Sequence, residues 1–350
     1  HDQLRTRLGA DALEVLQAGS IDPADVVTRV VTDAAPGSDE FVALAEAELD
    51  RAAARLSPAD GRMVQIVWFD PAAGGTGRLL VLIHHLVVDG VSWRVLVPDF
   101  ATAWAQVTSD QEPSLTAVGT SMRTWAHALV DEAASDSRVA ELAHWRSVLA
   151  DAGPRLGSRP VDPSVDTVST TDRFEIELPV PVTEALLGPL PEAYGGGVND
   201  ALLTALALAV GAWRRERGQD AGALTLDLEG HGREEDAVGR AADLGRTVGW
   251  FTTLYPVRLD VTDADLDDAL RGGPAAGTAV KAVKEQLLAV PERGIGYGLL
   301  RHLNAATADE LAALPSPEIG FNYLGRVSGP AGADTEQYAA FGWQPASDGG

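Results

Sequence analysis

The chain has 350 residues, of which 45% are hydrophobic, and 27 basic against 51 acidic residues give a formal net charge of −24. This length suits two domains of ordinary size. The acidic balance argues against a nucleic-acid partner, because phosphate binding needs basic patches. Cysteine is absent, which excludes disulfides, zinc–thiolate sites and cysteine nucleophiles. No apolar run has the ~18 residues of a membrane-spanning helix, and no signal peptide is recognisable, so the sequence predicts a cytoplasmic chain without a membrane partner.

The first half of the sequence predicts helices around a pair of strands. Residues 62–69 and 78–85 are apolar runs of strand length, joined by a Gly-rich loop. The second run is apolar at consecutive positions, which indicates that both of its faces are covered. Ser92 is expected to cap the helix that follows. The expected helices are residues 40–56, 93–104, 121–132 and 137–149.

The composition changes at residues 151–172, which are rich in Pro, Gly, Ser and Asp and have no period. We therefore expect an N-terminal lobe over residues 1–155, a linker over 156–172 and a C-terminal lobe over 173–350. Asn199 is the expected N-cap of the longest helix. The strands expected in this half are 173–179, 223–230, 251–260 and 317–325, and the helices are 198–217, 264–271 and 277–289.

His84 and His85 stand together at the end of a predicted strand. Because successive strand side chains point to opposite faces, the two imidazoles do not easily serve one site. On the residues alone, a structural pair is favoured over a catalytic one. A metal site would need Asp89 as a further ligand. A triad with Ser92 lacks the Gly-x-Ser-x-Gly turn that would expose the nucleophile.

Asp89 and Gly90 form a turn signal that follows the histidines. An aspartate in such a turn accepts backbone N–H groups or pairs with an arginine. We therefore expect Asp89 to hold the loop so that a histidine is aimed correctly.

Glu229 lies at the end of a predicted strand, in the sequence LEGHGRE of residues 228–234. Strand ends are where α/β sheets tend to carry function, and the glycines allow a tight turn close to a ligand. An acidic turn without function remains an equal alternative.

Three further blocks stand out: GRTVGWFTTLYPVRL (245–259), PERGIGYG (291–298) and FNYLG (321–325). The glycines of the second do not fit a dinucleotide fingerprint, and no strand leads into them. In the third, Asn322 and Tyr323 offer polar tips on an apolar strand. Arg214, Arg215 and Arg217 form a basic cluster, for which a solvated helix end is favoured over a docking surface.

Together, and in this order, these blocks resemble the epimerization domains of nonribosomal peptide synthetases, members of the condensation-domain superfamily. The similar stretches are HHLVVDGVSW, NDALLTAL, LEGHGRE, GRTVGWFTTLYPV, PERGIGYG and GFNYLG, and they extend from residue 84 to residue 325. The histidine block is shared across the superfamily, whereas EGHGRE and the GWFT–YP block are typical of the epimerization branch. The chain also looks like a domain truncated at both ends.

The resemblance implies an α/β fold of two chloramphenicol-acetyltransferase-like lobes that form a V with a central channel. It implies inversion, from L to D, of the α-carbon of an aminoacyl or peptidyl thioester. The thioester would be held on the phosphopantetheine arm of a peptidyl carrier domain, among neighbouring synthetase domains, and the domain would need no cofactor or metal of its own.

By the same resemblance, His85 and Glu229 are the catalytic pair, one on each lobe. His84, Asp89 and Gly90 support the histidine loop, and Asn322 and Tyr323 line the channel. Three rivals remain: a peptide-bond-forming condensation domain, an inactive docking member of the superfamily and, more distantly, a stand-alone acyltransferase.

Overall fold

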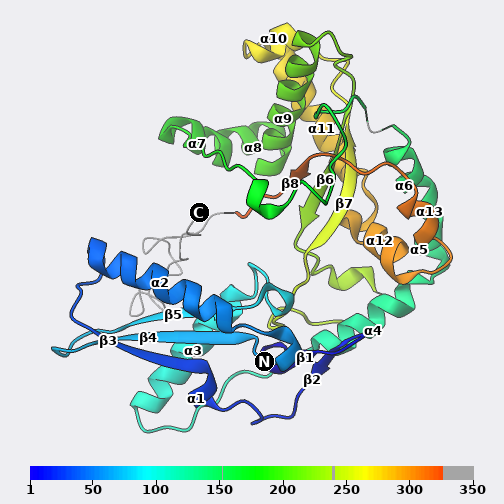
Figure 1. Ribbon diagram of the computed structural model, residues 1–350. Helices are drawn as coiled ribbons and strands as arrows, with labels where there is room; N and C mark the ends of the chain where they lie inside the picture. The colour runs from blue at the N-terminus through cyan, green and yellow to red at the C-terminus, as the bar shows by residue number, and fades with distance from the viewer. Residues whose placement is uncertain (152, 239–240, 326–350) are drawn as a thin grey trace. The chain divides into compact units, whose positions relative to one another are not determined.

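The computed structural model describes residues 1–151, 153–238 and 241–325 (Figure 1). Helices and strands alternate along the chain, which confirms the expected α/β class. The described residues form two compact units. The first holds residues 1–128, 241–252 and 324–325, and the second holds 129–238 and 253–323. The first boundary between the units falls after residue 128, before the linker expected at residues 156–172, and residues 241–252 of the expected C-terminal lobe belong to the first unit. The last 25 residues of that lobe lie outside the described part.

The first unit has a two-stranded antiparallel sheet, β1-β2, and a three-stranded sheet in the order β3-β4-β5. Strand β4 pairs parallel with β3 and antiparallel with β5, with Trp68 opposite Leu79. Both strands expected from the sequence are confirmed. The strands are β1 (Thr6–Leu8), β2 (Leu13–Val15), β3 (Val27–Thr32), β4 (Val64–Pro71) and β5 (Arg78–Ile83).

Helix α2 covers one face of the β3-β4-β5 sheet (Figure 1). Its N-terminus is capped by Ser38, whose side chain accepts the Phe41 N–H. Val67 and Phe69 alternate along β4 with outward residues and pack under the helix against Ala52. The helices up to residue 133 are α1 (Pro23–Val26), α2 (Asp39–Arg55), α3 (Trp93–Thr108) and α4 (Met122–Ala133), with short 3₁₀ turns at η1 (Asp2–Arg5), η2 (Pro58–Asp60) and η3 (His85–Val87).

The second unit has a three-stranded sheet in the order β7-β6-β8. Strand β6 (Leu224–Gly230) pairs antiparallel with β7 (Thr253–Leu259) and parallel with β8 (Gly320–Phe321). Leu224, Leu226 and Leu228 point to one face of β6 and enter the core. That core also holds residues of α6, α9 and α11, so helices cover this face of the sheet.

The helices of the second unit include the long α9, which confirms the helix expected there. Its N-cap is Gly197 and not Asn199, because Asp200 lies three residues after Gly197 and accepts its N–H. The helices are α5 (Asp136–Ala140), α6 (Leu142–Leu149), α7 (Val180–Leu187), α8 (Pro189–Tyr194), α9 (Val198–Glu216), α10 (Leu266–Leu270), α11 (Pro274–Leu288), α12 (Ile295–Gly298) and α13 (Ala308–Ala312). Shorter turns are η4 (Val168–Thr170), η5 (Glu235–Ala237), η6 (Pro291–Gly294) and the π-helical η7 (Leu299–Leu303).

The prediction of a strand over residues 173–179 is wrong. These residues pair with no strand in the described part of the chain, and Phe174, Ile176 and Leu178 are exposed by 86%, 73% and 47%. The alternation of apolar and charged residues is that of a strand, but a strand also needs a neighbour to hydrogen-bond.

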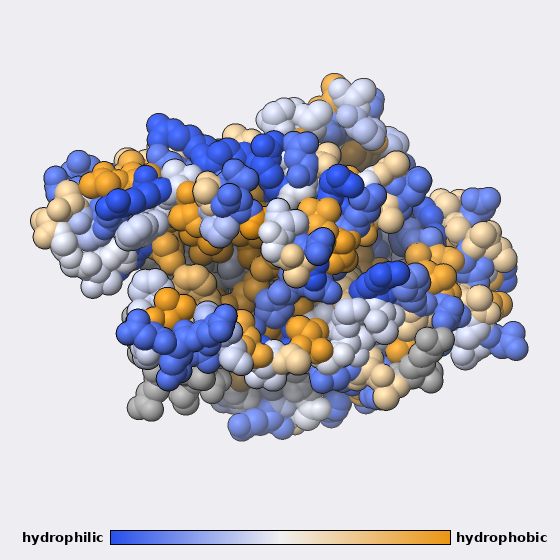
Figure 2. Space-filling model, turned by 90° about the horizontal axis from the view of Figure 1, so that it is seen from below, coloured by the Kyte–Doolittle hydropathy of each residue, from blue (hydrophilic) through white to orange (hydrophobic). Residues whose placement is uncertain are grey.

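The surface carries apolar side chains in several places. Phe100, Trp104 and Val107 form an exposed stripe on α3, at the i, i+4 and i+7 spacing of one helix face. Figure 2 shows hydrophobic patches separated by hydrophilic side chains on the face seen from below. In the described residues no single helix is long and apolar enough to cross a membrane, and one pair, 180–194 with 198–216, meets that criterion only together across a bend of 100°.

Candidate active site

The two histidines of the first unit have different surroundings. Strand β5 ends at Ile83, and the chain then turns into η3. His84 is tied to its own loop, because its backbone N–H donates to the Met63 carbonyl at 2.9 Å and its Nδ1 accepts the Leu86 N–H at 3.1 Å. His85 is exposed, and its ring centroid lies 4.7 Å from that of Trp250, at an interplanar angle of 55°. The second imidazole is therefore the more exposed and the less constrained of the two.

Asp89 is buried, with 4% of its surface exposed, and it fixes the loop after the histidines. Its Oδ1 accepts the Ser92 N–H at 2.7 Å and lies 2.7 Å from the Ser92 hydroxyl, while Oδ2 accepts the Phe251 N–H at 3.2 Å. A carboxylate with several donors holds its loop rigidly. Asp89 thus accepts backbone N–H groups, as expected for an aspartate in a turn, while its role in aiming a histidine stays a prediction.

Ser92 does not cap α3 with its side chain, so that prediction is wrong. Its fully buried hydroxyl is engaged elsewhere: Oγ accepts the Gly249 N–H at 3.1 Å and lies 3.0 Å from the Gly249 carbonyl. Gly90 lies in the turn between Asp89 and Ser92, as expected, but a Cβ there would meet open space and its φ is not positive. The turn itself does not require a glycine at this position.

Residues 245–251, the first part of the block 245–259, are hydrogen-bonded to the loop after His85 and to residues near it. Besides the contacts of Gly249, Trp250 and Phe251, Arg246 binds both carboxylate oxygens of Asp99 at 2.7 and 2.9 Å. The Thr247 hydroxyl donates to the Thr120 carbonyl at 2.7 Å. The sequence marked this block without giving its side chains a role. They join residues up to 162 positions apart, and no spacing within one sequence reveals such contacts.

In the second unit, Glu229 is the last residue but one of β6, and it stands opposite Leu254 of β7. Its side chain points to the face opposite that of Leu226 and Leu228. The parallel register pairs Leu228 with Phe321, which brings Asn322 and Tyr323 to the same end of the sheet. Among the residues that the structure describes, the Glu229 carboxylate has no hydrogen-bond or ion-pair partner. Such a group is available to exchange protons with a ligand.

Asp227 shares that face of β6 with Glu229, two residues earlier. Burial raises the pKa of its carboxyl to about 6. At neutral pH the Asp227 carboxyl is therefore ionised at the cost of its desolvation.

The raised pKa of Asp227 predicts a pH-dependent gain of stability in Asp227→Asn. At about pH 4 the wild-type carboxyl is protonated in the folded state and carries no desolvation penalty, but above pH 6 it is ionised and the penalty is complete. We expect the free energy of unfolding of the variant to exceed that of wild type by about 1–2 kcal/mol at pH 8, less than the full pKa shift implies because solvent screens this half-buried carboxyl, and to differ little at pH 4. Urea titrations at both pH values measure this, and a difference that does not change with pH would contradict it.

The PERGIGYG block contains a left-handed turn over residues 292–294. Glu292, Arg293 and Gly294 have φ values of 42°, 52° and 84°. Each of the two residues with a Cβ costs about 1–2 kcal/mol in this conformation. At Gly294 an added Cβ would lie 2.1 Å from the Tyr255 ring, so the turn lies directly on that ring.

Gly294→Ala is expected to destabilise the second unit by roughly 3 kcal/mol, since it adds a left-handed Cβ and an overlap with a buried ring. Gly298→Ala, in the same block, is the matched control. Gly298 has a helical φ of −61° and open space at its Cβ, so this change should raise stability slightly. Denaturant unfolding measures both, and equal effects would refute the packing argument.

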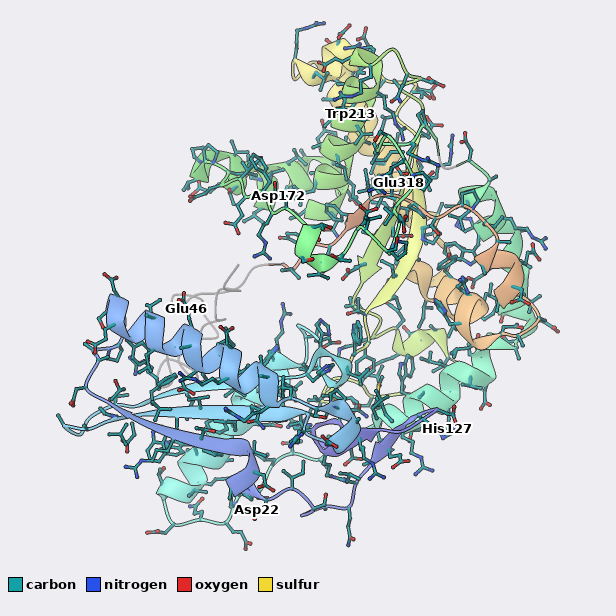
Figure 3. The ribbon with its side chains drawn as sticks, viewed as in Figure 1. Asp22, Glu46, His127, Asp172, Trp213 and Glu318 are labelled. Atoms are coloured by element: carbon teal, nitrogen blue, oxygen red, sulfur yellow. The ribbon has the colours of Figure 1, made fainter. Side chains whose placement is uncertain are left out.

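The arginine cluster at the end of α9 is only in part a solvated helix end: Arg215 and Arg217 are exposed, whereas Arg214 is buried. Arg214 is 2% exposed and donates to the carbonyls of Ala223 and Pro154, at 3.0 and 3.2 Å. Arg215 pairs with Asp267 at 2.7 Å, and the Arg217 guanidinium lies 3.8 Å from the ring centre of Trp213, which Figure 3 labels on α9. All three arginines thus have partners within their own unit.

The described residues contain no group of three or more His, Asp and Glu side chains that could hold a metal ion. Comparison with known proteins gives a match between residues 1–347 and the family described as Condensation domain. The chain belongs to the condensation-domain family.

Two curated relatives of this condensation-domain chain are synthases. Chondramide synthase cmdD of Chondromyces crocatus is 41% identical over 336 residues, which are 93% of this chain and 8% of that protein. Tyrocidine synthase 2 of Brevibacillus parabrevis is 38% identical over 274 residues, 76% of this chain and 7% of that protein. The chain thus spans less than a tenth of the length of either relative.

Among solved structures, the epimerization domain from the third module of tyrocidine synthetase B is 34% identical with a TM-score of 0.73, over 93% of this chain and 68% of that one. The first condensation domain of the calcium-dependent antibiotic synthetase is 20% identical with a TM-score of 0.57, over 92% of this chain and 69% of that one. The second likeness shows the shared fold alone.

Proposed function

We propose that this condensation-domain family member is an epimerization domain, which inverts the α-carbon of an aminoacyl or peptidyl thioester from L to D. The observation that carries the proposal is its likeness to the tyrocidine epimerization domain, which exceeds its likeness to a condensation domain in both identity and TM-score. The EGHGRE and GWFT–YP blocks favour the same branch.

The proposed chemistry needs two proton-exchanging groups and a stabilised oxyanion. The thioester carbonyl acidifies the α-proton, and its loss gives an enolate-like intermediate. A base on one face of the carbon and an acid on the other complete the inversion. We assign these roles to His85 and Glu229, which exchange them when the reaction runs in reverse. The exposed ring of His85 supports this assignment, as does the Glu229 carboxylate, which has no partner within residues 1–151, 153–238 and 241–325.

The remaining candidate residues have supporting roles in this proposal. Asp89 holds the histidine loop through the contacts described above, and His84 stabilises the same loop. Asn322 and Tyr323 contact the substrate or the enolate oxygen, since they follow β8 beside the strand of Glu229. Gly90 leaves room for the substrate, which is consistent with the open space at its Cβ.

The proposed substrate arrives on the phosphopantetheine arm of a peptidyl carrier domain, and the chain needs no cofactor of its own. Long synthases among the relatives support neighbouring synthetase domains as partners. We also retain as proposals the lobes 1–155 and 173–350, a linker at 156–172 and a cytoplasmic location.

The decisive experiment loads the cognate carrier with an L-aminoacyl or peptidyl arm and adds the domain in D₂O. We expect deuterium at the α-carbon and a growing fraction of D-configured thioester. A longer peptide formed from two loaded carriers would identify a condensation domain instead. Absence of both exchange and peptide formation would identify an inactive docking member of the family.

A further inference from the structure

The left-handed turn 292–294 is a conformation that the chain does not adopt without help. Two consecutive residues with side chains, Glu292 and Arg293, lie in the left-handed region before Gly294. Such residues persist only where their surroundings determine the backbone, and they concentrate at functional sites. The contacts of residues 292–294 with their surroundings must therefore fix this backbone conformation.

One end of the turn is fixed against β7. Gly294 lies on the ring of Tyr255, which is 7% exposed. Tyr255 stands directly opposite Leu228, and Leu228 immediately precedes Glu229. Burial raises the pKa of the Tyr255 hydroxyl, and the negative charge of Glu234 raises it further. The Tyr255 hydroxyl therefore lies close enough to Glu234 to feel its charge.

The other anchor is an ion pair. Arg293 Nη1 donates to Glu234 Oε2 at 2.5 Å, and Glu234 closes the EGHGRE block five residues after Glu229. The side chain of Glu234 is 12% exposed, whereas that of Arg293 is 76% exposed. His231 Nε2 lies 3.5 Å from the other oxygen of Glu234. The turn thus lies on Tyr255, which faces the residue before Glu229 across the sheet, and it is ion-paired with Glu234 at the end of the segment 229–234.

We propose that the turn 292–294 is a brace that positions Glu229, with Arg293 and Glu234 as its positioning residues. The exposure of Arg293 means that the ion pair adds little to global stability. Its effect is local, because it fixes where the loop leaves β6. The functional part of this inference rests on the proposed role of Glu229.

The test compares two glycine substitutions in the same turn. Arg293→Gly relieves the backbone strain at residue 293 and removes the guanidinium, whereas Glu292→Gly relieves the neighbouring strain and leaves the brace intact. Both variants should unfold at the same temperature as wild type or higher. We expect Arg293→Gly to lower kcat for α-proton exchange about tenfold to a hundredfold with KM unchanged, as for a misplaced catalytic group. Glu292→Gly should keep the wild-type rate, and Arg293→Lys should recover part of the loss.

Amide hydrogen exchange on the substrate-free domain tests the brace without the reaction. Arg293→Gly should accelerate exchange in residues 229–234, and Glu292→Gly should not. Wild-type protection and rate in Arg293→Gly would overturn the inference, as would an equal loss of rate in both glycine variants. If Arg293→Gly loosens 229–234 but wild type exchanges no substrate α-proton, the brace stands and the proposed function fails.

Discussion

Glu229→Gln is expected to lower the rate of α-proton exchange by about 10²–10⁴-fold, the usual contribution of general acid–base catalysis. The amide has nearly the shape of the carboxylate but cannot carry the proton. Because the Glu229 side chain has no partner among the described residues, the change leaves no buried group unpaired and the fold should persist. Deuterium incorporation from D₂O into the carrier-bound thioester measures the rate.

Asp227→Asn is the matched control for that experiment, because it neutralises a carboxyl on the same face of β6. It should keep most of the exchange rate, whatever it does to stability. Near wild-type exchange in Glu229→Gln would refute the mechanism with two proton-exchanging residues. An equal loss of rate in both variants would mean that the negative charge on this face of β6 matters, and not proton transfer by Glu229 itself.

His85→Ala is expected to cause a loss of similar size, about 10²–10⁴-fold, through removal of the second proton-exchanging group. The exposed imidazole makes its ring contact with Trp250, which is itself 47% exposed, so the cost to stability should be small. The same exchange assay measures the rate, and circular dichroism of each variant verifies the fold.

His84→Ala separates the two imidazoles. It removes the acceptor of the Leu86 N–H and should lower the free energy of unfolding by about 1 kcal/mol while most of the exchange rate remains. A larger loss of rate at residue 84 than at residue 85, with folding intact, would reverse the assignment.

The sequence predicted those elements whose signal is local. Strands β4 and β5 and helix α2 follow from apolar periodicity and turn residues, and all three formed as expected. The wrong predictions concern residues whose structure depends on a partner far away in the sequence. Ser92 has the residue type and position of a cap, but its hydroxyl bonds to Gly249. Residues 173–179 alternate like a strand but have no described neighbour.

The candidate site was predictable only in part, for the same reason. Asp89 could be given a supporting role because aspartate in a turn accepts N–H groups. One of those N–H groups belongs to Phe251, and Trp250 contacts His85. Both contacts join residues far apart in the sequence, so no local pattern could predict them. The strain at residues 292 and 293 was equally hidden, since neither Glu nor Arg favours a left-handed conformation.

The hydrogen bonds between Ser92 and Gly249 also bear on the order in which the chain folds during synthesis. Their partners are 157 residues apart, so the loop that carries His85 emerges from the ribosome long before the backbone groups that complete it. At about 5–20 residues per second this interval is on the order of 8–30 s. Until then, Asp89 Oδ2 lacks the Phe251 N–H and the Ser92 hydroxyl lacks the Gly249 backbone, so water must take these places. The histidine loop should therefore be among the last parts of its unit to become protected, and a nascent chain stalled before residue 245 should be cut by protease near that loop.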